Sequence, residues 1–122
     1  MHPYELIGLP YRLGAIPEKH GAADCLSLAR EVLLFHGVNT PAPQRSWYRR
    51  LRQGDTGVFT DELSKWGVKI ASPRLGSVAL CHSELGLGMA TFFEDGWIHF
   101  SGSVVIWSPI GVLQVEELFY SR

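Results

Sequence analysis

The sequence is poor in the side chains that build covalent and metal-based scaffolds. Its 122 residues include only two cysteines, Cys25 and Cys81, and five histidines. Two cysteines are too few for a disulfide framework and are typical of a protein made in a reducing cytoplasm. The cysteines and histidines also lack a close ligand pair with the spacing of about two to four residues that zinc sites use. We therefore expect no metal site.

An excess of charge of either sign is missing as well. Eleven Lys and Arg residues stand against twelve Asp and Glu residues, which gives a formal net charge of -1. A general nucleic-acid-binding protein would carry a clear basic excess, so we expect no nucleic-acid partner.

Long hydrophobic runs are also absent. Gly, Pro, Ser or charged residues interrupt every stretch before it reaches the roughly 18 residues that a membrane span needs. The segment Met1–Glu5 lacks the positive and apolar regions of a secretory signal. The sequence thus predicts no membrane span, and synthesis in the cytoplasm without a signal peptide.

Hydrophobic residues are plentiful and make up 46% of the sequence, which is enough for a core. The mass of 13.6 kDa suits one compact domain over residues 1–122. Pro and Gly predict an irregular lead-in over residues 1–20. A helical part is expected over residues 24–67, and strand-forming residues dominate residues 76–120.

The strongest helix signal covers residues 25–36, with Asp24 as the N-cap and Gly37 as the stop. A second helix is expected with Thr60 as its cap and Gly67 at its end. Between them, Arg45–Arg52 holds four of the cations. We interpret this run as a solvated, partly packed helix face; the alternative is a contact surface for a phosphate or an acidic partner.

After Gly76 the chain is rich in short runs of strand-forming residues separated by turn residues. Asp95-Gly96 is the best hairpin signal in the chain. The end, residues 114–120, fits either a strand or a helical turn. The predicted fold class is therefore α+β, with N-terminal helices packed on a C-terminal antiparallel sheet.

Cys25 is the most informative residue for chemistry. At the first turn of a helix, unpaired N–H groups and the helix dipole favour the nucleophilic thiolate. The alternative interpretation is a small buried hydrophobic residue next to the N-cap. His99, on a predicted strand after the Asp95-Gly96 turn, is the candidate base if the fold brings it to the thiol. Its alternative role is a half-buried strand histidine bonded to a carbonyl.

Several motifs together resemble the NlpC family of papain-like cysteine peptidases, especially the short versions from phage tail modules. The likeness covers residues 10–107 and rests on Tyr11, Gly14, Gly21, Asp24-Cys25 followed by an aliphatic helix, Gly76, and Asp95 to His99. It implies a papain-like NlpC-type fold with no metal or organic cofactor, acting on bacterial cell-wall peptides. By this resemblance Cys25 is the nucleophile, His99 the orienting polar residue, and Tyr11 and Asp24 part of the substrate site.

The sequence departs from the family at the position of the general base. Where the family has His-Val-Gly-Ile-Tyr, this chain has Leu87-Gly88-Met89-Ala90-Thr91. The nearest upstream histidine, His82, comes five residues earlier than that position. Loss of a general base costs roughly 10²–10⁴ in rate.

Two hypotheses about function follow. In the first, the chain is a cysteine peptidase or amidase of a phage or prophage tail module, with weak or lost activity on cell-wall peptide. In the second, the same fold is a non-catalytic structural or docking component of the virion, whose partners are other tail proteins. Both place the protein in the tail of a virion. A weaker third idea is a domain that binds cell-wall peptide without cutting it.

Overall fold

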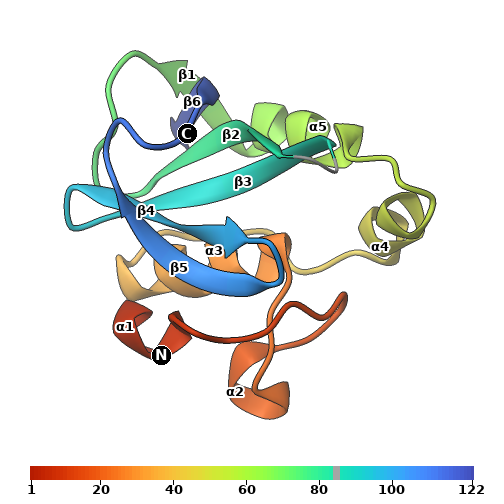
Figure 1. The fold of residues 1–122 in the computed structure, drawn as a ribbon. Helices are drawn as coiled ribbons and strands as arrows, with labels where there is room; N and C mark the ends of the chain where they lie inside the picture. Colours follow the sequence, from red (N-terminus) through yellow and green to blue (C-terminus); the bar gives the residue numbers. More distant parts are fainter. Residues whose placement is uncertain (84–85) are drawn as a thin grey trace.

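The computed structural model describes residues 1–83 and 86–122, and Figure 1 shows their arrangement as helices packed against one strongly twisted sheet. The helices are α1 (Pro3–Leu6), α2 (Pro17–His20), α3 (Cys25–Phe35), α4 (Arg45–Arg52) and α5 (Gly57–Trp66). The strands are β1 (Gly67–Ile70), β2 (Ser77–Ser83), β3 (Gly86–Phe93), β4 (Gly96–Ser101), β5 (Val104–Pro109) and β6 (Val115–Ser121). The fold class is α+β, as the sequence predicts.

All strands pair antiparallel in the order β1-β6-β2-β3-β4-β5. Strands β2 to β5 form the expected meander of consecutive neighbours. The C-terminal segment is a strand, and it does not extend the meander but enters the sheet between β1 and β2. It therefore joins the first strand, Gly67–Ile70, to the rest of the sheet.

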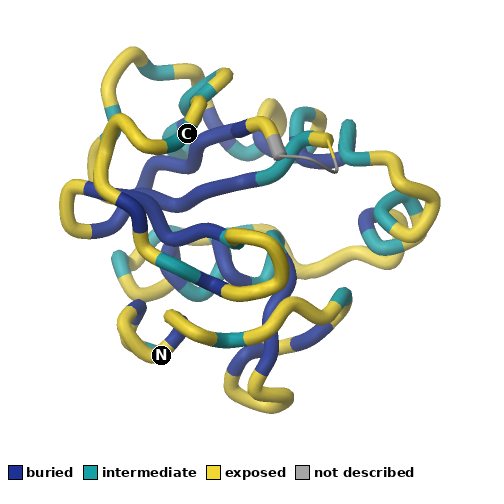
Figure 2. Tube along the Cα trace, viewed as in Figure 1, coloured by how far each residue is buried: buried dark blue, intermediate teal, exposed yellow. Residues whose placement is uncertain are grey.

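Helices α3 and α5 cover one face of the sheet. The core between them is formed by two groups of buried side chains, one around Trp47, Phe59 and Phe119 and the other around Leu28 and Ile98. A third group lies on the opposite face, where Phe92 and Trp97 pack edge to face. Figure 2 shows the consequence: the middle of the sheet and the inner side of α3 are buried, while most loops and turns are exposed.

The start of α3 is fixed by a reciprocal cap, as its sequence predicts. The Asp24 carboxylate accepts the Ser27 N–H at 2.8 Å, and the Ser27 hydroxyl accepts the Asp24 N–H at 3.0 Å. The second carboxylate oxygen of Asp24 accepts the Gly14 N–H at 2.7 Å, which ties the lead-in to the helix. At the other end, Gly37 takes a left-handed φ of 74° after the last turn.

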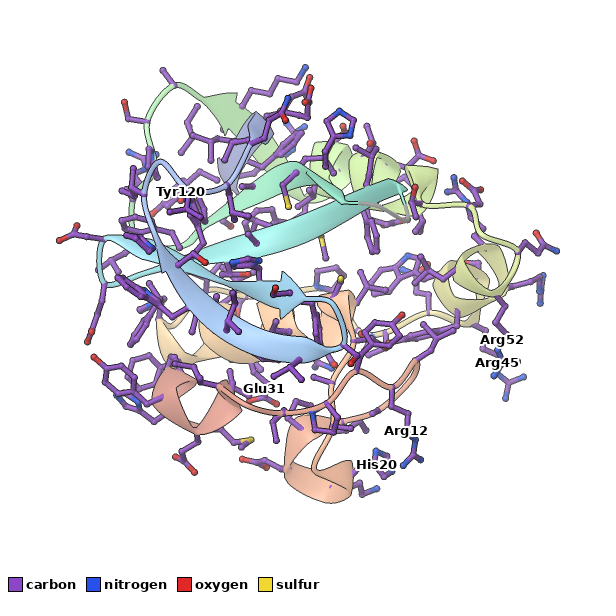
Figure 3. All side chains as sticks on the ribbon, viewed as in Figure 1. Arg12, His20, Glu31, Arg45, Arg52 and Tyr120 are labelled. Atoms are coloured by element: carbon purple, nitrogen blue, oxygen red, sulfur yellow. The ribbon has the colours of Figure 1, made fainter. Side chains whose placement is uncertain are left out.

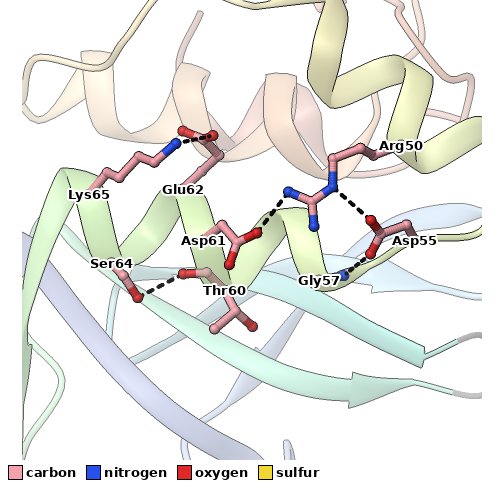
Figure 4. Close-up of polar contacts among 8 residues, drawn as sticks. All are labelled: Arg50, Asp55, Gly57, Thr60, Asp61, Glu62, Ser64 and Lys65. Atoms are coloured by element: carbon pink, nitrogen blue, oxygen red, sulfur yellow. Dashed lines mark hydrogen bonds and ion pairs between the residues drawn. The ribbon is translucent and has the colours of Figure 1, made fainter.

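An arginine joins α4 to α5 (Figure 4). Arg50 donates to Asp55 at 2.7 Å and to Asp61 at 2.8 Å, and the other oxygen of Asp55 accepts the Gly57 N–H at 3.0 Å. Of the four arginines in this run, Arg50 thus forms ion pairs within the chain. The run forms a helix that buries Trp47, so one side of it is packed against the rest of the chain.

Two local expectations are wrong, and one strand was not expected. The lead-in is not wholly irregular, because proline at the first helical position starts the short helices α1 and α2. Helix α5 begins at Gly57 and not after Thr60, since Asp55 already satisfies its first N–H group. The strand Gly67–Ile70 has no counterpart in the predicted elements.

No helix in residues 1–83 and 86–122 has the length and apolar character that crossing a bilayer requires.

Candidate functional site

Cys25 is the first residue of α3, and its side chain faces strand β3. The Cys25 side chain is half-buried, and the backbone N–H of Met89 lies near its sulfur. The residue packs against the same core group as Leu26 and Leu87. The helix therefore presents its first side chain to the middle of the sheet, where the resemblance places a nucleophile.

The surroundings of this thiol oppose ionisation. Burial raises the pKa of Cys25 to about 12, the Met89 N–H lowers it by a smaller amount, and the Asp24 carboxylate raises it further. A catalytic cysteine needs the reverse, a positive or hydrogen-bonding environment that stabilises the thiolate. Burial and the neighbouring carboxylate thus outweigh the helix N-terminus.

The negative charge of Asp24 contributes to a raised pKa in two nearby tyrosines, Tyr11 and Tyr48. Burial, Cys25 and Asp24 together raise the pKa of Tyr11 to about 12, and burial followed by Asp24 does the same for Tyr48 of α4. Tyr11 also packs edge to face against Phe100, with ring centres 5.2 Å apart. The structure therefore brings Tyr11, Asp24 and Cys25 close together.

His99 does not join them. Its neighbours in the strand, Ile98 and Phe100, pack on the side of α3, and alternation along β4 turns His99 to the opposite face of the sheet. There its Nε2 lies 2.8 Å from the Ser108 hydroxyl and its Nδ1 lies 3.1 Å from the Phe100 carbonyl oxygen. The expected pairing of His99 with Cys25 is not formed; His99 is the strand histidine bonded to a carbonyl, the alternative considered above.

The hydrogen bonds of His99 define its protonation. The Phe100 carbonyl only accepts, so Nδ1 carries the proton and Nε2 accepts from the Ser108 hydroxyl. Burial lowers the pKa of His99, and the hydrogen bond to Phe100 raises it by less. The ring is a neutral, buried link between β4 and β5.

The other histidines have structural partners of their own. His2 caps α1, His20 accepts the Ile16 N–H at 2.8 Å, and His36 packs against Phe93. His82 pairs with Glu116 at 3.0 Å on the exposed end of β2. Across the described ranges, none of the five histidines forms a hydrogen bond with the Cys25 sulfur.

Leu87 occupies the position that the resemblance assigns to the general base. Met89, two residues further on, has its side chain on the helix-facing side of β3, so alternation places Leu87 on that side too. Gly88 between them is opposite Cys81, which belongs to the core group on the other face. The side chain at this position is therefore apolar and lies on the helix-facing side of β3.

Residues of the site that the sequence did not reveal are Met89 and Tyr48. Both lie far from Cys25 along the chain and carry no motif. Only the packing of α3 on β3 and of α4 beside α3 brings them close. The described residues also contain no group of three His, Cys, Asp or Glu side chains placed to hold a metal ion.

No family model matches the sequence of this chain, and no curated protein matches it significantly.

Proposed function

We propose that this chain is a non-catalytic domain with an NlpC-type arrangement, which serves as a docking component of a phage or prophage tail. The motifs around Tyr11 and Asp24-Cys25 support the NlpC-type arrangement, together with a helix that starts at the cysteine and packs on an antiparallel sheet. The tail assignment rests on the likeness to the short family members in phage tail modules.

The observation that carries the loss of catalysis is the state of the Cys25 thiol. Burial raises the pKa of this thiol to about 12, so the neutral thiol is the main form at pH 7.5. No histidine accepts its proton, and Leu87 stands where the family has the base. A cysteine peptidase needs both the thiolate and the base, so the geometry favours the docking role over the peptidase.

The surface that fits a docking role is the outer side of α4. Arg45, Arg49 and Arg52 are exposed and form no ion pair with any carboxylate in the described residues, whereas Arg50 is held by Asp55 and Asp61. Figure 3 shows Arg45 and Arg52 projecting away from the body of the molecule. We infer that this side of α4 contacts an acidic surface of another tail protein.

Alkylation of the native protein with iodoacetamide at pH 7.5 tests the loss of catalysis. Cys25 and Cys81, whose thiol pKa burial raises to about 11, should both react slowly in the folded state and quickly in urea. Rapid labelling of Cys25 alone, with release of cell-wall peptides that Cys25→Ala abolishes, would show the peptidase instead.

The docking role has a separate positive test. The protein should be recovered from purified tail particles in fixed stoichiometry, and replacement of Arg45, Arg49 and Arg52 by Gln should remove it from them. A freely soluble protein that is absent from the particles contradicts this role. Arg50→Gln is not a suitable control here, because Arg50 also holds α4 to α5.

A further inference from the structure

The end of the molecule away from α4 is formed by α1, the end of α3, and the end of β3 with its turn to β4 (Figure 1). Aromatic rings from these segments pack together. The ring centre of Phe93 lies 5.4 Å from that of Tyr4 and 6.3 Å from that of Phe35. Phe93 is buried, but Tyr4 is 54% exposed and Phe35 is 47% exposed. This end therefore presents two aromatic side chains to solvent.

Carboxylates lie next to these rings. Glu94 and Asp95 are exposed in the turn between β3 and β4, and Glu94 accepts a hydrogen bond from the Tyr4 hydroxyl. Glu5, which follows Tyr4 on α1, is exposed as well. Within residues 1–83 and 86–122, none of the three carboxylates forms an ion pair. We call this surface the acidic end; its residues are Tyr4, Glu5, Phe35, Glu94 and Asp95.

The arginine face of α4 complements the acidic end. Arg45, Arg49 and Arg52 follow one another at intervals of four and three residues, so they lie along one side of the helix. A guanidinium group binds a carboxylate through paired N–H groups and also stacks on aromatic rings. The acidic end offers both kinds of partner. The net charge of -1 also leaves little overall repulsion between two copies of the chain.

We propose that the acidic end of one copy of this chain binds the arginine face of α4 on the next copy. The two surfaces lie at opposite ends of the molecule, so they cannot meet within one copy (Figure 1). A contact between two unlike surfaces is head-to-tail, and it forms a ring where the rotation closes and a filament where it does not. The inference rests on the proposed docking role of α4, and it assigns the acidic surface that α4 contacts to a second copy of the chain.

Sedimentation velocity of the wild-type protein at pH 7.5 tests the association. In about 50 mM NaCl, the average mass should rise above the 13.6 kDa of the monomer as the protein concentration increases from about 10 μM to about 1 mM. In about 500 mM NaCl the association should be at least about tenfold weaker, because salt screens exposed charges. A wild-type protein that stays monomeric at low salt overturns the inference, whatever the variants do.

Two variants, each altered in one surface, test the pairing. The first replaces Arg45, Arg49 and Arg52 by Gln. The second combines Glu94→Gln with Asp95→Asn, and asparagine tolerates the left-handed φ of 55° at position 95. Each variant alone should associate at least about tenfold more weakly than the wild-type protein. An equimolar mixture should form a 1:1 dimer that does not grow further, because each partner keeps one intact surface. A mixture that stays monomeric contradicts the pairing.

A charge control and an aromatic variant complete the set. Glu116→Gln with Glu117→Gln removes two carboxylates that already pair with His82 and Lys69, and it should associate like the wild-type protein. An equal loss of association in this control would overturn the assignment to the acidic end. Tyr4→Leu should weaken the association by about two- to fivefold, because it removes a ring on which a guanidinium group stacks.

The docking role and the self-association can fail separately. If the wild-type protein is monomeric but the arginine variant is lost from tail particles, α4 docks on a different protein and the self-association is wrong. If the wild-type protein associates through both surfaces but the arginine variant remains in the particles, the self-association stands and the docking role is wrong.

Discussion

The thiol of Cys25 is subject to two opposing influences. Its place at the first turn of α3 and the Met89 N–H both favour the thiolate. Burial against the core and the neighbouring Asp24 carboxylate favour the neutral thiol, and their effect is larger, so the pKa of Cys25 is raised to about 12. The position at a helix N-terminus therefore does not by itself lower the pKa of this thiol.

Leu87→His tests whether a histidine at this single position is enough to make the Cys25 thiol reactive. The new imidazole lies on the helix-facing side of β3, like Met89, and is expected to stabilise the Cys25 thiolate. We expect the rate of alkylation of Cys25 at pH 7.5 to rise about tenfold, which corresponds to a fall of one unit in the thiol pKa. Mass spectrometry of the alkylated peptide measures it.

Gly88→His is the matched control for that variant. Position 88 points to the other face of the sheet, and a Cβ atom built there meets no atom within 4 Å, so the backbone accepts the substitution. The rate at Cys25 should stay at the wild-type value. An equal increase in both variants would mean that a general loosening of β3, and not the imidazole, exposes the thiol.

At the scale of the element, α3 depends on one buried carboxylate. Asp24 is 1% exposed and accepts N–H groups from both the helix and the lead-in. Asp24→Ala removes the cap, worth about 1 kcal/mol, and leaves the Gly14 N–H unsatisfied, worth about 1–3 kcal/mol. We expect the free energy of unfolding in urea to fall by about 2–4 kcal/mol.

Asp24→Asn separates the contribution of the helix cap from that of the hydrogen bond to the Gly14 N–H. The amide oxygen still accepts one N–H group, so the loss of stability should be clearly smaller than for Asp24→Ala. If both variants unfold at the wild-type urea concentration, the Asp24 contacts do not stabilise α3.

The boundaries of the elements show which local signals are sufficient. Helix α3 begins and ends where its cap and Gly37 predict, because the chemistry that fixes both ends lies within three residues of them. The hairpin between β3 and β4 also forms as predicted, although its two left-handed residues are Glu94 and Asp95. Helix α5 starts earlier than predicted, since its first N–H group is satisfied from outside the helix by Asp55.

At the scale of the whole molecule, the half-buried His36 and the buried His99 make stability depend on pH. Burial lowers the pKa of both His36 and His99 in the folded state. The unfolded chain, whose histidines titrate near 6.5, then binds more protons than the folded chain between the lowered values and about pH 6.5. Their favourable contribution is complete above this range and is lost as the pH falls through it.

We therefore expect the free energy of unfolding, measured in urea, to decrease from pH 7.5 to pH 5.5. The decrease should be smaller in His99→Gln and His36→Gln than in the wild-type protein, because each variant removes one titrating group. An identical pH dependence in all three proteins would contradict this assignment.

The sequence by itself determined the features that depend on near neighbours. These are the α+β class, the cap and stop of α3, the hairpin after Phe93, and the place of Cys25 at a helix N-terminus. Periodicity, capping and turn residues act over a few positions, so they can be read along the chain.

Only the tertiary structure decided which residues meet across the core. It turned His99 away from α3, placed Met89 near Cys25, and inserted β6 between β1 and β2. The face that a strand presents and the burial of a thiol are set by elements far apart in sequence. For this reason the sequence could identify a candidate nucleophile, while the packing of the fold determined that His99 does not pair with it.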